Sequence, residues 1–334
     1  MLKASILSLA LVMPTFASTI SAERHTLTAD GKTDTYLLIS KSGFYTETSG
    51  NQTPDDFMGH PEYHHISQIF DNTLGKYVFA FDIHIDYKEG DSLITDGNKG
   101  TLTDRQRNEI KCMSSRPATV AEDGETITYR WKFMLPQGMQ TTSAFCHIHQ
   151  IKGMGDSEAV AHPVFTLTCR TAGNRQVLQL INVPYEGSAN VTLSQIDLQP
   201  LLGRWIEAKE TLTVGHNGKY TLTLTDVETG LTMMRSTEND IEIWRDTDDR
   251  STMRGKWGIY RSLGDKLSLK GQLRSERILF ADFEITKGDN GSSVPVIHAT
   301  EPDNGATYDI TGKITDGYNA GIMIRKGKKI LKQH

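Results

Sequence analysis

Polar and apolar residues alternate over several short stretches of the chain, and this pattern most constrains the fold. In the stretch TITYRWKFML at residues 126–135, every second residue is apolar, namely Ile127, Tyr129, Trp131, Phe133 and Leu135. The alternation recurs at residues 78–86, 165–170, 220–225 and 280–285. Because successive side chains of a strand point to opposite faces, the pattern predicts many half-buried strands.

Turn residues separate these stretches, and helical periodicity is scarce. Asn217-Gly218 predicts a tight hairpin, and Glu228-Thr229-Gly230 predicts a second turn. Many short strands with few helices indicate an antiparallel architecture. We therefore expect an all-β protein, an antiparallel β-sandwich of the jelly-roll type.

The two ends of the chain differ in composition from its middle. Lys3 and the short apolar run after it, followed by small residues up to Ala22, predict a signal peptide over residues 1–22. A polar, glycine-containing linker begins at Gly288. The sequence thus predicts a main domain over residues 23–287 and a linker and tail over residues 288–334. We expect the mature protein to be secreted, periplasmic or at the cell surface.

The tail contains YDITGK at residues 308–313 and GIMIRKGKK at residues 321–329. These motifs resemble the small C-terminal appendage of exported Bacteroidetes proteins, in which a YDLxGR…GIYIxxGKK pattern recurs. The resemblance implies a small β appendage for sorting or anchoring, separate from any active site. The alternative is a disordered basic tail.

Charge and apolar content exclude two classes of partner. Lys and Arg number 36 against 41 Asp and Glu, a formal net charge of -5. A nucleic-acid-binding domain usually carries a basic excess, so nucleic acid is not an expected partner. No later stretch is apolar enough to span a membrane, and we expect a monomer. Of the three cysteines, Cys146 and Cys169 lie in predicted strands, where they either pair or, as we favour, stay buried free thiols.

Charged residues crowd one face of residues 104–111 (DRQRNEIK). Alternation places Arg105, Arg107, Glu109 and Lys111 together on that face. Such a face is a poor core, but it suits a cleft that binds carboxylates, because Arg grips a carboxylate with two hydrogen bonds. The alternative is a solvated outer face.

Residues 145–153 (FCHIHQIKG) combine groups for proton transfer and binding, namely His147, His149, Gln150 and Lys152. Histidine suits proton transfer near neutral pH. The two histidines could instead hold a zinc ion with His84 as a third ligand, or one of them could be structural. Upstream, the HPEYHH motif at residues 60–65 makes His65 a further candidate for a cleft.

Residues 256–262 (KWGIYRS) form the third segment of interest. Trp257 and Ile259 would face the core, which leaves Lys256, Gly258 and Tyr260 on the opposite face. A glycine at position 258 would let a ligand approach the backbone closely.

The order and spacing of the three segments resemble the active-site strands of the alginate-lyase-type jelly-roll polysaccharide lyases. Those strands read RxELR, QIH and KxGxYxQ, and this chain has RNEIK at 107–111, HQIK at 149–152 and KWGIY at 256–260. Heparin-lyase-like proteins share the same concanavalin A-like sandwich. The resemblance spans roughly residues 44–285. Two positions depart from it, because Lys152 stands where the family has histidine and Ser262 replaces the last glutamine.

The resemblance implies cleavage of an acidic, uronic-acid-containing polysaccharide by β-elimination, with no required cofactor. Arg107 and Gln150 would engage the carboxylate, and Tyr260 would act as general acid and also as base. His149, or His147 through a bulge or a shifted register, is the second candidate for proton transfer. The substrate-binding candidates are Arg105, Glu109, Lys111, His147, Lys152, Lys256 and His65.

Two other functions stay open. A glycoside hydrolase needs a pair of carboxyl groups, and Glu109 is the only acidic residue well placed in the three segments. A non-catalytic carbohydrate-binding protein would rely on exposed aromatic residues instead. Separately, Asp246, Asp248 and Asp249 either hold a structural Ca²⁺ or form a solvated loop.

Overall fold

The computed structural model describes residues 23–47, 55, 63–88, 92–95, 104–155, 158–185, 189–245, 250–265 and 268–288, and then 307–309, 314–315, 321–325 and 328–332. The chain divides into two compact units, residues 1–290 and 291–334. The expected signal peptide and the Asp246, Asp248 and Asp249 cluster lie outside the described residues. Within these ranges, no helix is long and apolar enough to cross a membrane.

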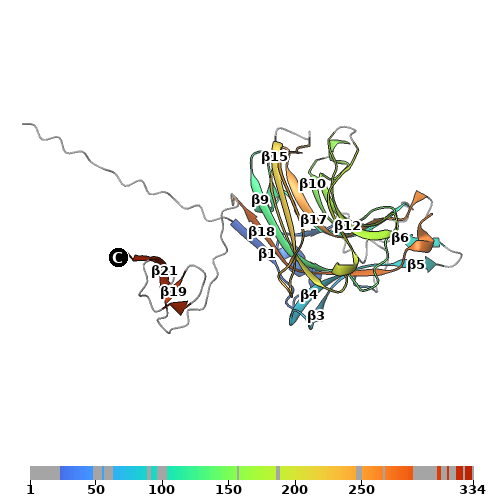
Figure 1. Ribbon diagram of the computed structural model, residues 1–334. Coiled ribbons are helices and arrows are strands. Elements are labelled where there is room, and N and C mark those ends of the chain that lie inside the picture. The colour runs from blue at the N-terminus through green and yellow to red at the C-terminus, as the bar shows by residue number, and fades with distance from the viewer. Residues whose placement is uncertain are drawn as a thin grey trace, which may run out of the picture. The chain divides into compact units, whose positions relative to one another are not determined.

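The larger unit is a sandwich of two antiparallel sheets, which confirms the predicted fold class (Figure 1). We call them the back sheet and the front sheet. The back sheet has the spatial order β16-β15-β14-β9-β18-β4-β3, and β1 pairs with β18. Its strands are β1 (Glu23–Leu27), β3 (Ile66–Asp71), β4 (Lys76–Ile83), β9 (Thr126–Met134), β14 (Trp205–Thr213), β15 (Gly215–Asp226), β16 (Thr232–Ile243) and β18 (Glu276–Lys287).

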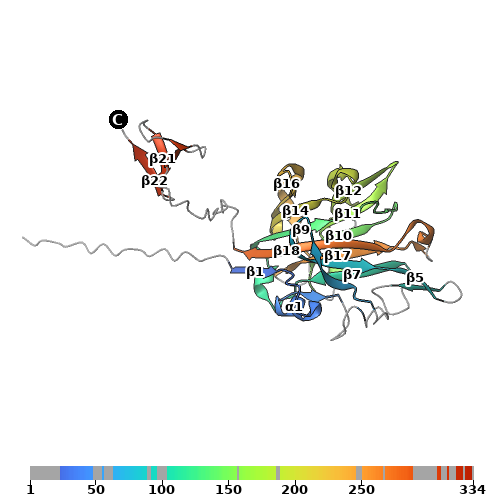
Figure 2. The same cartoon turned by 90° about the horizontal axis from the view of Figure 1, so that it is seen from below.

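The front sheet has the spatial order β13-β12-β11-β10-β17-β7-β2, and β8 pairs with β17. Figure 2 shows β12, β11, β10, β17 and β7 in this succession. Its strands are β2 (Tyr45–Thr46), β7 (Arg105–Lys111), β8 (Val120–Ala121), β10 (Cys146–Gly153), β11 (Phe165–Ala172), β12 (Arg175–Asn182), β13 (Val191–Asp197) and β17 (Met253–Ser262). All three segments singled out from the sequence are therefore strands of one sheet, and β17 lies between the other two.

Few other elements complete the described chain. Helix α1 (Thr35–Lys41) begins after Asp34, whose carboxylate accepts a hydrogen bond from the Leu37 amide at 2.9 Å. Short 3₁₀ turns lie at Pro117–Thr119, Glu158–Val160, Gln199–Leu201 and Lys270–Gln272, and β5 (Ile85–Lys88) pairs with β6 (Ser92–Thr95). The smaller unit is a sheet of order β20-β19-β21-β22, made of β19 (Thr307–Asp309), β20 (Ile314–Thr315), β21 (Gly321–Arg325) and β22 (Lys328–Lys332).

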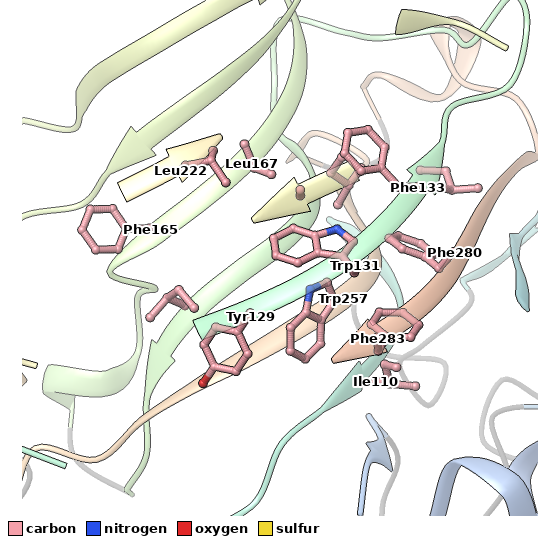
Figure 3. Packing of buried hydrophobic residues seen from close by; sticks show 14 of the residues in the cluster. Ile110, Tyr129, Trp131, Phe133, Phe165, Leu167, Leu222, Trp257, Phe280 and Phe283 are labelled. Atoms are coloured by element: carbon pink, nitrogen blue, oxygen red, sulfur yellow. The ribbon is translucent and has the colours of Figure 1, made fainter. Parts of the chain in front are cut away.

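Aromatic residues from both sheets fill the space between them (Figure 3). Trp131 of the back sheet and Trp257 of the front sheet are 0% and 1% exposed, and their ring centroids lie 5.9 Å apart. Phe280 and Phe283 of β18 pack in the same cluster. This burial confirms the inward face that the alternation predicted, and it leaves the other face of the front sheet free to carry polar groups.

One of the two predicted turns is wrong in detail. Gly230 has φ +70° and its amide bonds to the Asp226 carbonyl at 2.8 Å, so the turn between β15 and β16 forms as expected. Asn217-Gly218 instead lies inside β15, in a stretch that pairs with β16 through bulges. A Cβ on Gly218 would lie 2.7 Å from the Thr213 carbonyl oxygen, so close backbone packing explains this glycine.

Candidate active site

A cleft of about 690 Å³ opens on the outer face of the front sheet. Side chains of β7, β17, β10 and β11 line it, together with residues of two segments, 161–163 and 181–184. The predicted site residues that line it are Arg105, Arg107, His147, Gln150, Lys152, Lys256 and Tyr260. The structure therefore brings most of the predicted site together in one place.

Four residues stand directly opposite one another on adjacent strands, and three of them, Arg107, Tyr260 and His147, line the cleft. Arg107 of β7 faces Tyr260 of β17, Tyr260 faces His147 of β10, and His147 faces Thr168 of β11. The Arg107 guanidinium carbon lies 4.3 Å from the centroid of the Tyr260 ring, and the rings of His147 and Tyr260 are 5.7 Å apart. A cation, a phenol and an imidazole thus form one row across the sheet.

A bulge in β10 decides which histidine joins this row. The pairing register of β10 shifts between His147 and His149 against both neighbouring strands. As a result Ile148 and His149 both lie in the interior, while His147 and Gln150 share the cleft face. The expectation that His149 is catalytic is wrong. His149 is 1% exposed, packs on Trp131 and Trp257, and bonds through Nε2 to Glu210 of the back sheet at 2.8 Å.

His147 is held in a fixed orientation at the cleft. Its Nδ1 atom lies 2.8 Å from the Thr168 hydroxyl, and its ring stacks on Phe145 at 4.6 Å. Burial, together with the positive charges of Arg170, Lys256 and Arg107, lowers the pKa of His147 from 6.5 to about 3. The imidazole is therefore neutral near pH 7, the form that can accept a proton, but it is a weaker base than an ordinary histidine.

Ion pairs support the floor of the cleft beside this row. Glu109 lies 2.9 Å from the Lys256 ammonium, and the Gln150 amide donates to the same carboxyl group. Glu47, just after β2, lies 3.0 Å from Lys111, 3.2 Å from Arg107 and 3.5 Å from Lys256. Burial would raise the pKa of Glu47, but the charges of these three cations outweigh it and lower the pKa. The two carboxylates offset part of the positive charge of the three cations, and the network holds its long side chains in place.

Three further site expectations need correction. Glu109 is 2% exposed and, like Lys111, is not among the residues that line the cleft, because both are engaged in the ion pairs beneath it. His65 is 0% exposed and is bound to Asp55, with its amide nitrogen and its Nδ1 atom 2.8 and 3.0 Å from Oδ1. None of these three residues lines the cleft, and Glu109 and His65 are buried.

Gly258 does not have the expected role of letting a ligand approach the backbone. Its φ is +147°, and a Cβ there would lie 2.1 Å from the Asn108 carbonyl oxygen and 2.7 Å from the Glu109 Cα atom. The missing side chain therefore lets β17 and β7 approach each other, and it does not make room for a ligand.

Several residues of the cleft were not predicted from the sequence. Phe145, His162, Thr166 and Arg170 line it, and Thr168 orients His147. The signal for part of this set was present, because Thr166, Thr168 and Arg170 alternate along β11 and form its polar face. Glu47 carried no such signal, since only the pairing of β2 with β7 brings it to the site.

The zinc hypothesis is wrong for the two histidines of β10, because His147 and His149 point to opposite faces of the sheet. The third candidate, His84, packs instead against His65 with their ring centroids 5.0 Å apart. In the described parts of the chain, no three His, Cys, Asp or Glu residues cluster as metal ligands would. Cys146 and Cys169 face each other on β10 and β11 as free buried thiols, the alternative that we favoured.

Comparisons with known proteins give similarity in structure alone. No protein-family model matches the chain, and no curated protein matches it. A glucuronan lyase from the fungus Trichoderma reesei is similar at 13% identity and a TM-score of 0.44, over 66% of this chain and 86% of that one. A family 7 alginate lyase solved with a substrate is similar at 14% identity and a TM-score of 0.44, and the match covers 67% of this chain and 83% of that one. The PL-14 alginate lyase from Aplysia kurodai is similar at 13% identity and a TM-score of 0.44, and the match covers 72% of this chain and 97% of that one.

Proposed function

We propose that the chain is a polysaccharide lyase that cleaves a uronic-acid-containing polysaccharide by β-elimination. The observation that carries this proposal is the row in which Tyr260 stands between Arg107 and His147 on the floor of an open cleft. Elimination needs a group that neutralises the substrate carboxylate, a base for the proton on C5 and an acid for the leaving oxygen O4. The row supplies all three types of group.

Arg107 and Gln150 are the groups that would hold the substrate carboxylate. The Arg107 Nε atom is buried, lies 3.9 Å from the Glu109 carboxylate and forms no hydrogen bond with the described residues. Gln150 donates one N–H to Glu109, and its amide nitrogen carries a second. Hydrogen bonds from a cation to a carboxylate would stabilise the charge that builds up when the C5 proton leaves.

His147 and Tyr260 would carry out the two proton transfers. The neutral imidazole takes the C5 proton, and the electron pair of that bond forms the C4–C5 double bond. The C4–O4 bond breaks, and the Tyr260 hydroxyl gives its proton to O4. The phenolate that remains is stabilised by Arg105, whose Nη1 lies 3.0 Å from the phenolic oxygen. Transfer of a proton from the imidazolium, directly or through water, then restores both groups.

The lining of the cleft does not favour hydrolysis. Within the described residues, no Asp or Glu lines it, whereas a glycoside hydrolase needs two carboxyl groups that flank the bond. The proton-transfer groups also distinguish the site from that of a binding module.

A panel of uronic-acid polysaccharides tests the proposal. We expect at least one polymer to yield products that absorb in the ultraviolet, because only elimination creates an unsaturated uronate. New reducing ends without this absorbance would indicate a hydrolase, and binding without either product would indicate a binding protein. Either of these results would refute the proposed function.

We also propose that the enzyme is exported and acts as a monomer without a metal cofactor. The predicted signal peptide and the motifs of the tail support export. Activity that survives extensive treatment with a chelator would agree with the absence of a required metal. N-terminal sequencing of the mature protein would test the cleavage expected after residue 22.

A further inference from the structure

The cations that line the cleft differ in whether a carboxylate accompanies them. Arg105 is paired with Asp104, Arg107 with Glu47, and Lys256 with Glu109. Lys152 and Arg170 have no carboxylate partner within the described residues. The Lys152 ammonium donates a hydrogen bond of 3.1 Å to the Ala161 carbonyl, whereas the buried Arg170 Nε atom forms no hydrogen bond there. Burial alone lowers the pKa of Arg170, which agrees with the absence of a nearby negative charge.

Arg170 lies close to the reacting groups but not among them. It follows Thr168 by two positions on β11, so both side chains lie on the cleft face, and Thr168 is the residue that orients His147. Arg170 also contributes to the lowered pKa of His147, so the two side chains are within electrostatic range. Two strand spacings separate β11 from β17, which is about 10 Å across the sheet.

We propose that Arg170 forms a second anion-binding subsite, which takes the carboxylate or sulfate of a sugar next to the one that is cleaved. A partly buried guanidinium without a counter-charge has lost hydration and gained no ion pair in return. Its planar fork matches a carboxylate or a sulfate, which would provide that missing pair. This inference rests on the proposed function. It narrows the substrate to polymers that carry anionic groups on neighbouring sugars.

Binding to a variant without turnover tests the subsite separately from catalysis. Tyr260→Phe serves as the parent, and Arg170→Gln and Arg170→Lys are added to it. Calorimetry then measures the affinity for hexasaccharides of polyglucuronate, of alginate and of heparin. We expect Arg170→Gln to weaken the binding of an anionic hexasaccharide by about ten- to a hundred-fold, as is usual for a lost charged hydrogen bond. Arg170→Lys should keep part of the affinity, because it retains the charge.

A matched control and a neutral ligand make the result specific. Arg175 begins the next strand, is 63% exposed and pairs with Asp197, and it does not line the cleft. Arg175→Gln should therefore leave affinity unchanged. Polyglucuronate hexasaccharide with reduced carboxyl groups should bind the Arg170→Gln variant and its parent equally. If Arg170→Gln loses affinity only for the heparin hexasaccharide, the subsite binds a sulfate. If it loses affinity for the polyglucuronate and alginate hexasaccharides, the subsite binds a carboxylate.

The inference is overturned if Arg170→Gln binds every hexasaccharide within twofold of its parent, or if Arg175→Gln shows the same loss. Failure of the lyase function is recognised separately. If the wild-type protein forms no unsaturated product from any polymer, the elimination mechanism is refuted, while the binding result for Arg170 still stands.

Discussion

The Nη1 atom of Arg105 donates a hydrogen bond of 3.0 Å to the phenolic oxygen of Tyr260. Arg105 is itself held by Asp104, since its Nε atom lies 3.0 Å from both carboxylate oxygens. A guanidinium remains charged at all pH values at which the protein is folded. The oxygen that would give up a proton therefore lies beside a permanent cation, which links the geometry of the cleft to the proposed chemistry.

Replacing Tyr260 by phenylalanine should nearly abolish elimination while the fold is kept. The change removes one hydroxyl from a half-buried ring, and the loss of a general acid typically costs about 10²- to 10⁴-fold in rate. Turnover is measured by ultraviolet absorbance, and folding by thermal unfolding. Near-normal turnover in this variant would show that the tyrosine has no role in proton transfer.

Replacing Arg105 by methionine should lower kcat and change KM little. The arginine acts on the phenolate that forms during the reaction, and the loss of a charge-assisted hydrogen bond corresponds to about a ten- to hundred-fold lower rate. Arg175→Met is the control, because that arginine is exposed and lies outside the cleft. A rise in KM with unchanged kcat would assign Arg105 to substrate binding instead.

His147 should make the protein sensitive to acid. A histidine in the unfolded chain takes up a proton near pH 6.5, whereas folded His147 does so only near pH 3. Between these values the unfolded state binds the extra proton, so stability falls as pH is lowered through this window. His147→Gln removes this linkage. Urea unfolding at neutral pH and at about pH 5 should show a smaller loss of stability for the variant than for the wild type. Equal losses would contradict the shift.

The buried pair of His149 and Glu210 should contribute to stability and not to chemistry. Glu210 is 0% exposed, bonds to His149 across the core and accepts a hydrogen bond from Tyr220 at 2.6 Å. Removing one partner of a buried pair costs about 3–5 kcal/mol, so Glu210→Ala should lower the free energy of unfolding by that amount.

A neighbour on the same strand is the control for this change. Glu207 also lies on β14, but its side chain is 31% exposed and lies 3.7 Å from Arg130. Such surface pairs contribute about 0–1 kcal/mol, so Glu207→Ala should have a small effect in the same urea titration. Similar losses for the two variants would mean that the pair across the core is not special.

Adding a methyl group at Gly258 should disturb both stability and activity. The new Cβ would collide with the backbone of Asn108 and Glu109 in β7. The two strands would have to move apart, which would displace Tyr260 relative to Arg107. Overpacking and an unfavourable φ each cost about 1–3 kcal/mol, so Gly258→Ala should lower both the melting temperature and the rate. Gly271→Ala is the control, because nothing described lies within 4 Å of a Cβ there. An unaffected Gly258→Ala protein would argue against the close approach of the two strands.

The alternation of residues was sufficient to find the strands and to assign most faces. Trp131 and Trp257 were expected in the core and lie there, and Arg105, Arg107 and Tyr260 were expected on the opposite face and line the cleft. These assignments succeed because successive side chains of a strand point to opposite faces. This alternation is a local property of the backbone and does not depend on residues far away in the sequence.

The sequence alone thus determined the fold class, the three strands that carry the site and most of the side chains on their cleft face. Tertiary structure decided the rest. The bulge in β10 turned His149 inward and left His147 beside Tyr260, and strand pairing brought Glu47 and Arg170 to residues far away in the sequence. Bulges and pairing partners depend on how separate segments hydrogen-bond and pack. The alternation of residues within one segment therefore cannot predict them.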